Sequence, residues 1–94
     1  LLIGSSTGGP PALEAVLRQF GAACPPILIA QHIPAGFSRS FAERLDRELE
    51  MEVSEAQDGD AVRPGRVLIA PGNLHMLLAG APGALRVVVK DGPL

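Results

Sequence analysis

The residues best suited to chemistry lie at the start of the chain, where residues 4–8 have the spacing G-x-S-x-G with Ser6 at the centre. Gly4 and Gly8 are small enough to allow a sharp turn that exposes a central serine hydroxyl. An apolar stretch, residues 1–3, precedes this turn, and a pair of prolines that can open a helix follows it. Ser6 is therefore the candidate nucleophile.

The same turn has other interpretations. The N–H groups of residues 7–9 would lie at the positive end of a helix dipole, which favours a bound phosphate or an oxyanion. A P-loop requires Lys and Ser/Thr where this chain has Pro10 and Pro11, so ATP and GTP are disfavoured. The glycines do not fit G-x-G-x-x-G, and no acidic residue closes the second strand to hold a ribose. A nucleophile, an anion-binding loop and a plain small-residue turn all stay open.

A serine needs a base to remove its proton, and His32 is the candidate. It follows the second expected strand, residues 26–30, and ligands of open parallel sheets bind outside the carboxyl ends of the strands. Strand ends that neighbour each other would bring Ser6 and His32 to one edge. A single histidine is more often structural, and His75, which begins a hairpin, has the weaker position.

No residue of the chain convinces as the acid that orients the histidine. The aspartates at positions 58, 60 and 91 all fall in expected turns and are interpreted as turn formers. The two histidines and the single cysteine are too far apart in sequence for metal-ligand spacing, so we expect no metal and no cofactor.

Composition restricts the possible functions further. The chain has 94 residues, enough for one small domain, and carries 8 basic against 10 acidic side chains without a basic cluster. Nucleic acid and anionic lipid are therefore disfavoured as partners. No apolar run approaches the roughly 20 residues of a membrane span. The lone Cys24 cannot form an internal disulfide, which favours a reducing compartment such as the cytoplasm.

The first half of the sequence predicts a strand, helix, strand, helix order. Residues 1–3 and 26–30 are apolar runs typical of strands covered on both faces of a parallel sheet. The helix between them, ended by Gly21, has an apolar stripe of Leu13, Val16, Leu17 and Phe20. A second helix is predicted to start near Ser38, with Ser40 and Glu43 as a capping box and with Phe41, Leu45 and Leu49 on one face.

Beyond residue 49 the pattern changes to short strands separated by turn residues. Strands are predicted over residues 51–56, 66–70, 75–79 and 85–90, and the connections are expected to be tight hairpins instead of helical crossovers. The whole predicts an α/β, Rossmann-like three-layer sandwich with a mainly parallel sheet and a C-terminal β-hairpin region.

Four segments in order, residues 3–10, 29–45, 55–59 and 67–76, resemble the protein-glutamate methylesterases of bacterial chemotaxis. The resemblance covers the whole chain. It implies a serine hydrolase that removes methyl groups from glutamyl esters on chemoreceptors, releases methanol and also deamidates receptor glutamines. By this resemblance Ser6 is the nucleophile, His32 the general base and Thr7 a neighbour that contributes to the oxyanion site.

The resemblance also implies that the chain is truncated. The family's orienting aspartate lies beyond Leu94, so residues 1–94 are expected to form the N-terminal part of a catalytic domain, without the phosphorylatable receiver domain that precedes it in chemotaxis members. The expected partners are the cytoplasmic helices of methyl-accepting chemoreceptors. Alone, the chain is expected to be nearly inactive and to self-associate through uncovered apolar surface. The alternatives are an inert homologous fragment and an anion or nucleotide-binding module that uses residues 5–9.

Overall fold

The structure is a computed structural model, and it describes residues 2–5, 14–31, 36–72 and 74–91. The side chains of residues 2–5 and 31 are outside this description. Ser6, Thr7 and His32, the predicted site residues, lie outside the described residues, as does Leu13 of the predicted helical stripe.

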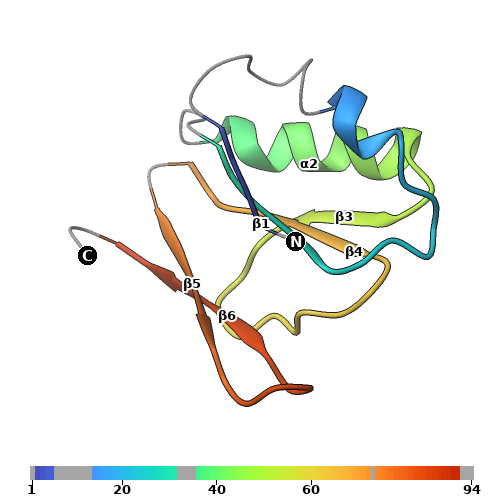
Figure 1. Ribbon diagram of the computed structural model, residues 1–94. Helices are drawn as coiled ribbons and strands as arrows, with labels where there is room; N and C mark the ends of the chain where they lie inside the picture. Colours follow the sequence, from blue (N-terminus) through green and yellow to red (C-terminus); the bar gives the residue numbers. More distant parts are fainter. Residues whose placement is uncertain (1, 6–13, 32–35, 73, 92–94) are drawn as a thin grey trace.

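A four-stranded parallel sheet forms the centre of the molecule, in the order β1-β2-β4-β3 (Figure 1). Its strands are β1 (Leu2–Ser5), β2 (Ile27–Gln31), β4 (Arg66–Ile69) and β3 (Glu52–Glu55). The side chains of β2 at positions 27–29 are at most 6% exposed, so this strand is covered on both faces, as the continuous apolar run indicated. The predicted α/β class with a mainly parallel sheet is confirmed.

Different elements cover the two faces of the sheet, because successive strand residues point to opposite sides. Helix α2 (Phe37–Glu48) and a helical turn at residues 14–17 cover one face. The core there consists of Leu17, Cys24, Ile27, Ile29, Phe41, Ala42, Leu45, Met51, Val53, Val67 and Ile69. On the other face lies the antiparallel hairpin of β5 (His75–Ala79) and β6 (Arg86–Lys90), with a smaller core of Leu28, Ala56, Leu68 and Val87. The predicted C-terminal hairpin is confirmed.

The start of α2 differs from the prediction. The helix begins at Phe37 with Gly36 as its N-cap, in the left-handed region at φ 89°, and no side chain caps it. The predicted capping box of Ser40 and Glu43 is therefore wrong, because both residues lie inside the helix, where their side chains are exposed. Glycine supplies the backbone conformation that starts the helix instead. Phe41 and Leu45 are buried as predicted.

The first helical segment ends earlier than predicted. After residue 17 the bonding changes to tighter turns, in which the N–H of Gln19 donates to the carbonyl of Val16 and that of Phe20 to Leu17. Leu17 is fully buried and Phe20 packs against the core, but Val16 is 42% exposed. The apolar stripe on this segment is therefore narrower than the periodicity indicated.

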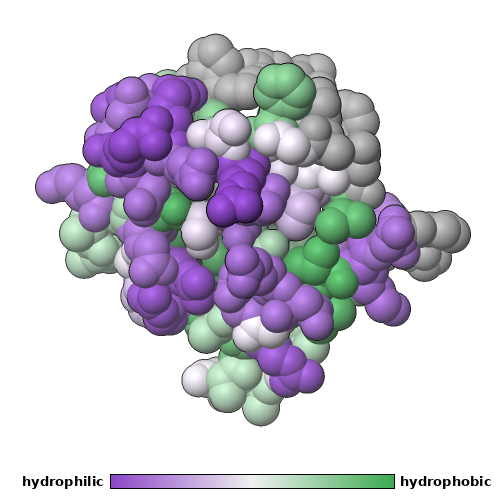
Figure 2. All heavy atoms as spheres, turned by 180° about the vertical axis from the view of Figure 1, so that it is seen from behind, coloured by the Kyte–Doolittle hydropathy of each residue, from purple (hydrophilic) through white to green (hydrophobic). Residues whose placement is uncertain are grey.

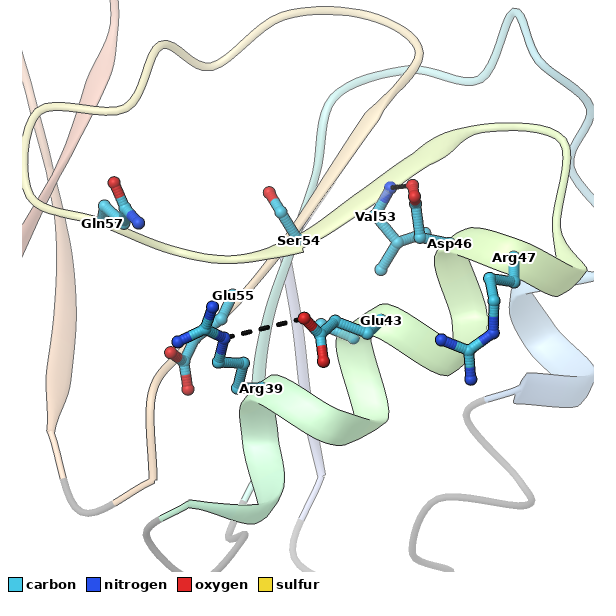
Figure 3. Close-up of a pocket in the computed structure, with 9 residues that line it drawn as sticks. Arg39, Glu43, Asp46, Arg47, Val53, Ser54, Glu55 and Gln57 are labelled. Atoms are coloured by element: carbon cyan, nitrogen blue, oxygen red, sulfur yellow. Dashed lines mark hydrogen bonds and ion pairs between the residues drawn. The ribbon is translucent and has the colours of Figure 1, made fainter.

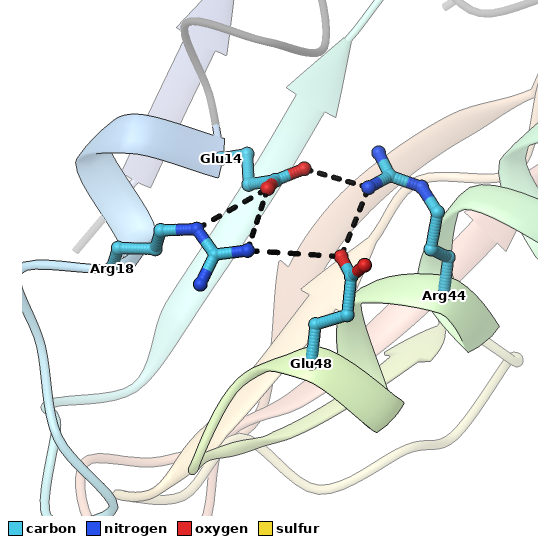
Figure 4. A network of polar contacts seen from close by, with 4 residues as sticks. All are labelled: Glu14, Arg18, Arg44 and Glu48. Atoms are coloured by element: carbon cyan, nitrogen blue, oxygen red, sulfur yellow. Dashed lines mark hydrogen bonds and ion pairs between the residues drawn. The ribbon is translucent and has the colours of Figure 1, made fainter.

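A four-residue ionic network joins the two helical segments (Figure 4). The guanidinium of Arg44 on α2 donates to Glu14 at 2.7 Å and to Glu48 at 3.0 Å, and Arg18 lies 2.8 Å from the other Glu14 oxygen. Hydrogen bonds from Arg18 and then Arg44 hold the pKa of Glu14 below its ordinary value. The same contact with Glu14 raises the pKa of Arg44.

Strands β3 and β4 pair in parallel, so the hairpin predicted between them is wrong. The connection, residues 56–65, is held against the hairpin: the N–H of Gly59 donates to Val87, that of Val87 to Asp60, and that of Val62 to Leu85. These bonds let a connection without a helix join two parallel strands. Turn residues show where a strand ends, and they do not show which strand it pairs with.

In the described part of the chain, no helix is long and apolar enough to cross a membrane.

Candidate active site

Strands β1 and β2 end at the same level of the sheet. Their parallel register pairs Gly4 with Ala30 and Ser5 with Gln31. Ser6 and His32 are the residues that follow Ser5 and Gln31 in the sequence. Neighbouring strands lie about 4.8 Å apart. The structure thus brings together the two chain positions that directly precede the predicted nucleophile and base, while their own placement stays a prediction.

A buried hydrogen-bond cluster lies at the carboxyl edge of the same sheet. Ser38, in the first turn of α2, has no exposed surface. Its hydroxyl donates to Glu55 Oε2 at 2.5 Å and accepts the backbone N–H of Gly72 at 2.8 Å. Glu55 is the last residue of β3, and Gly72 lies three residues after the end of β4. We call Ser38, Glu55 and Gly72 the edge cluster.

Sequence reasoning missed the edge cluster. The sequence pattern places Ser38 only near a helix start and Glu55 only within a strand. One signal was nevertheless present, because Ser38, Glu55 and Gly72 each belong to a different one of the four segments on which the family resemblance rests. Residues in separate segments can meet only in the fold, and the sequence did not show that these three do.

Glu55 does not serve as the missing orienting acid. The sheet order places β3 two strands away from β2, a separation of about 10 Å at the usual strand spacing. Glu55 and Ile29 both have Ile69 of β4 as their register partner, so they lie at the same height in the sheet. Ile29 precedes His32 by three residues. Its carboxylate also accepts the hydroxyl of Ser38. Position and bonding both indicate a structural role for Glu55.

The aspartates interpreted as turn formers behave as expected where the structure describes their contacts. Asp58 Oδ1 accepts the N–H of Val89 at 2.9 Å, which ties the β3–β4 connection to β6. Asp60 Oδ2 accepts the N–H of Gln57 at 2.8 Å within the turn itself. Neither carboxylate is at the edge formed by Ser5 and Gln31, so these two residues are structural.

The remaining chemical residues are separate from the strand ends. His75 is half-buried and pairs with Lys90 in the hairpin, and Cys24 is a free thiol, 3% exposed, in the helix-side core. Arg39 is an exposed residue of α2 that lies 3.7 Å from Glu43. Across residues 2–5, 14–31, 36–72 and 74–91, no three His, Cys, Asp or Glu side chains are grouped so as to hold a metal ion.

A groove of about 470 Å³ runs between α2 and β3 (Figure 3). It is lined by Arg39, Ala42, Glu43, Asp46, Arg47, Val53, Ser54, Glu55 and Gln57. On the helix side of the groove, Arg39 and Glu43 of α2 form an ion pair. Asp46 of α2 accepts the backbone N–H of Val53 in β3. Because β3 is the edge strand opposite β1, this groove is not at the end of β1 and β2. We therefore place the candidate active site at those strand ends and not in the groove.

Hydrophobic residues reach the described surface in more than one place. Seen from behind in Figure 2, hydrophilic side chains cover most of the described surface, and hydrophobic ones emerge in separate patches. The exposed large hydrophobic residues come from different elements: Val16, Phe37, Leu77 and Leu78. The most exposed of them, Phe37 at 66%, begins α2.

Comparison with known proteins identifies the family of this arrangement. A family model described as CheB methylesterase matches residues 1–93. The chain is 55% identical over 94 residues to a Rhodospirillum rubrum protein named protein-glutamate methylesterase/protein-glutamine glutaminase 2, and 47% identical over 94 residues to the protein-glutamate methylesterase/protein-glutamine glutaminase of Borreliella burgdorferi. Both alignments include the whole of this chain. They include only 26% of the first protein and 24% of the second, so the chain spans about a quarter of the length of these curated relatives.

A solved structure gives the same result. The crystal structure of the Thermotoga maritima CheB methylesterase catalytic domain superposes with a TM-score of 0.88 at 42% sequence identity. The match covers 98% of this chain and 49% of that one.

Proposed function

Because the chain belongs to the CheB methylesterase family, we propose that it supplies the nucleophile and the general base of a protein-glutamate methylesterase that is also a protein-glutamine glutaminase. Ser6 is the nucleophile, His32 is the base, and Thr7 contributes to the oxyanion site. The observation that carries the proposal is the register of β1 and β2, which pairs Ser5 with Gln31 directly before Ser6 and His32.

The proposed reaction is acyl transfer through a covalent intermediate. The Ser6 hydroxyl attacks the ester carbonyl of a glutamyl methyl ester while His32 accepts its proton. As the tetrahedral intermediate collapses, the departing methoxide oxygen takes the proton from His32 and leaves as methanol, and an acyl-enzyme remains. Water, deprotonated by His32, then releases the glutamate carboxylate and restores Ser6. With a glutamine side chain the same steps expel ammonia.

The rest of the proposal concerns the complete protein. Residues 1–94 form the N-terminal part of the catalytic domain, the orienting aspartate lies beyond Leu94, and a receiver domain precedes the catalytic domain. The match of this chain to 49% of the solved catalytic domain supports the view that residues 1–94 are part of such a domain, and the other two statements rest on the family resemblance. The substrate is a chemoreceptor cytoplasmic helix, and the protein acts in the cytoplasm. Without an orienting acid a serine triad loses about 10⁴-fold in rate, so residues 1–94 alone should show little turnover.

The proposal is tested in the complete protein by methanol release from methylated receptor. Ser6→Ala should lower kcat on the order of 10⁴-fold or more, because it removes the hydroxyl that attacks the ester carbonyl. Ser40→Ala, which removes an exposed serine of α2, is the control and should keep full activity. Unchanged turnover in Ser6→Ala overturns the assignment. Saturable ATP or NAD binding that Gly9→Ala abolishes would favour a nucleotide-binding loop instead.

A further inference from the structure

The edge cluster is built around a residue type that is costly to bury. Ser38 is the one fully buried polar side chain in the described part of the chain. Its hydroxyl has one hydrogen to donate and gives it to Glu55, and it accepts the N–H of Gly72. Removing one partner from such a buried set leaves the others unsatisfied, which is more damaging than losing the bond itself.

The cluster fixes three chain segments relative to one another at the carboxyl edge. Ser38 belongs to the start of α2, Glu55 to the end of β3, and Gly72 to the turn after β4. The turn is further held by the N–H of Leu74, which donates to the carbonyl of Pro71 at 3.1 Å. Strand β4 is bonded to β2 up to its end, where the N–H of Ala70 donates to Ile29 at 2.8 Å.

Described residues flank the segment that contains His32 on both sides. At its start, Gln31 pairs with Ser5 in the sheet. At its end, the chain passes through Gly36, whose φ of 89° is a conformation that favours glycine, and reaches Ser38 two residues later. Six residues, 32–37, lie between Gln31 and Ser38. The location of the first turn of α2 therefore sets where the chain that follows His32 must arrive.

We propose that Ser38 and Glu55 are positioning residues for the esterase reaction, which influence the geometry of the Ser6–His32 pair by anchoring the start of α2 at Ser38, six residues after His32. This inference rests on the proposed function. Ser38 has no exposed surface with which to contact a substrate, and the edge cluster lies at the ends of β3 and β4, away from β1. Displacements of about 1 Å far from the chemistry can change a catalytic rate, because the reacting atoms must be closely aligned.

The alternative is that the cluster stabilises the fold and nothing more, and the chain offers a matched control. Asp46 also joins α2 to β3, since its carboxylate accepts the N–H of Val53 at 2.8 Å. It does so near the end of the helix, at the opposite end from Ser38. Asp46→Ala and Ser38→Ala therefore both remove a bond between the same two elements, and they differ in which end of α2 they release.

The experiment uses the complete protein and counts active sites with an alkyl fluorophosphonate, which labels a nucleophilic serine with loss of fluoride. We expect Ser38→Ala and Glu55→Ala to lower kcat per labelled site by about tenfold, corresponding to about 1.4 kcal/mol, with KM nearly unchanged. Glu55→Gln keeps an oxygen that accepts the Ser38 hydroxyl and should restore kcat. Asp46→Ala should keep the kcat per labelled site of the unmodified protein, even if it lowers the urea midpoint as much as Ser38→Ala does.

The outcomes separate this inference from the function on which it rests. Full kcat per labelled site in folded Ser38→Ala or Glu55→Ala overturns the positioning role, as does an equal loss in Asp46→Ala. If Ser38→Ala does not fold, the comparison of Glu55→Ala with Glu55→Gln decides, because both keep the serine. An inactive unmodified protein, or an active Ser6→Ala variant, overturns the proposed function itself.

Discussion

Ser5 and Gln31 are register partners at the ends of two parallel strands. This pairing is the structural reason why two residues 26 positions apart in the sequence, Ser6 and His32, are candidates for one site. Parallel strands joined by a crossover have their carboxyl ends at the same edge, and ligands collect there.

His32 should be needed for turnover in the complete protein. His32→Gln removes the base that accepts the serine proton, and we expect kcat for methanol release to fall about 10²–10⁴-fold. His75→Gln is the matched control, because His75 lies in the hairpin and pairs with Lys90. Equal losses in the two variants would show that the assignment of the base is wrong.

Gly80 should be the glycine of the hairpin turn that tolerates substitution least. Its φ is 103°, and an added Cβ would lie 2.5 Å from the carbonyl oxygen of Ala84. Gly83 also has a positive φ, 86°, but a Cβ there meets nothing within 4 Å. We expect Gly83→Ala to cost about 1–2 kcal/mol from backbone strain alone. Gly80→Ala should cost about 1–3 kcal/mol more, because the backbone must also shift.

Urea unfolding, with hydrogen exchange of the β5 and β6 amides, measures both variants of the turn. Exchange in β5 and β6 should accelerate more in Gly80→Ala than in Gly83→Ala. Similar stabilities for the two variants would contradict the close approach of Ala84.

The ionic network of Figure 4 should make the docking of residues 14–20 sensitive to acid. The pKa of Glu14 is lowered in the folded state by hydrogen bonds from Arg18 and Arg44. A lowered folded pKa stabilises the fold fully above the ordinary glutamate pKa, and this contribution is lost as the pH falls through the folded value. Glu14→Gln should therefore lower the urea midpoint near neutral pH, and the difference from the unmodified protein should shrink in acid.

This prediction is measured as urea midpoints between about pH 3 and pH 6, with and without added salt. Glu50→Gln, which removes an exposed carboxylate without an ion pair among the described residues, is the control. A difference between Glu14→Gln and the unmodified protein that stays constant in acid would show that the network does not act through the charge of Glu14.

The sequence by itself determined the local structure and the chemical candidates. Apolar runs marked β2 and β4 to within about a residue, and the 3.6-residue periodicity identified the buried residues Phe41 and Leu45 of α2. These succeeded because burial on a sheet or a helix face leaves a pattern in neighbouring residues. The same local spacing, together with the family resemblance, selected Ser6 as nucleophile and His32 as base.

Only the tertiary structure decided the pairings between distant segments. The parallel pairing of β3 with β4 depends on hydrogen bonds from the connecting chain to β6, about 30 residues away, such as that from Gly59 to Val87. The edge cluster likewise joins residues 38, 55 and 72, and the start of α2 is set by the backbone of Gly36 instead of by a capping side chain. Such contacts form between parts of the chain that have no common local pattern, so their energies appear only once the chain is folded.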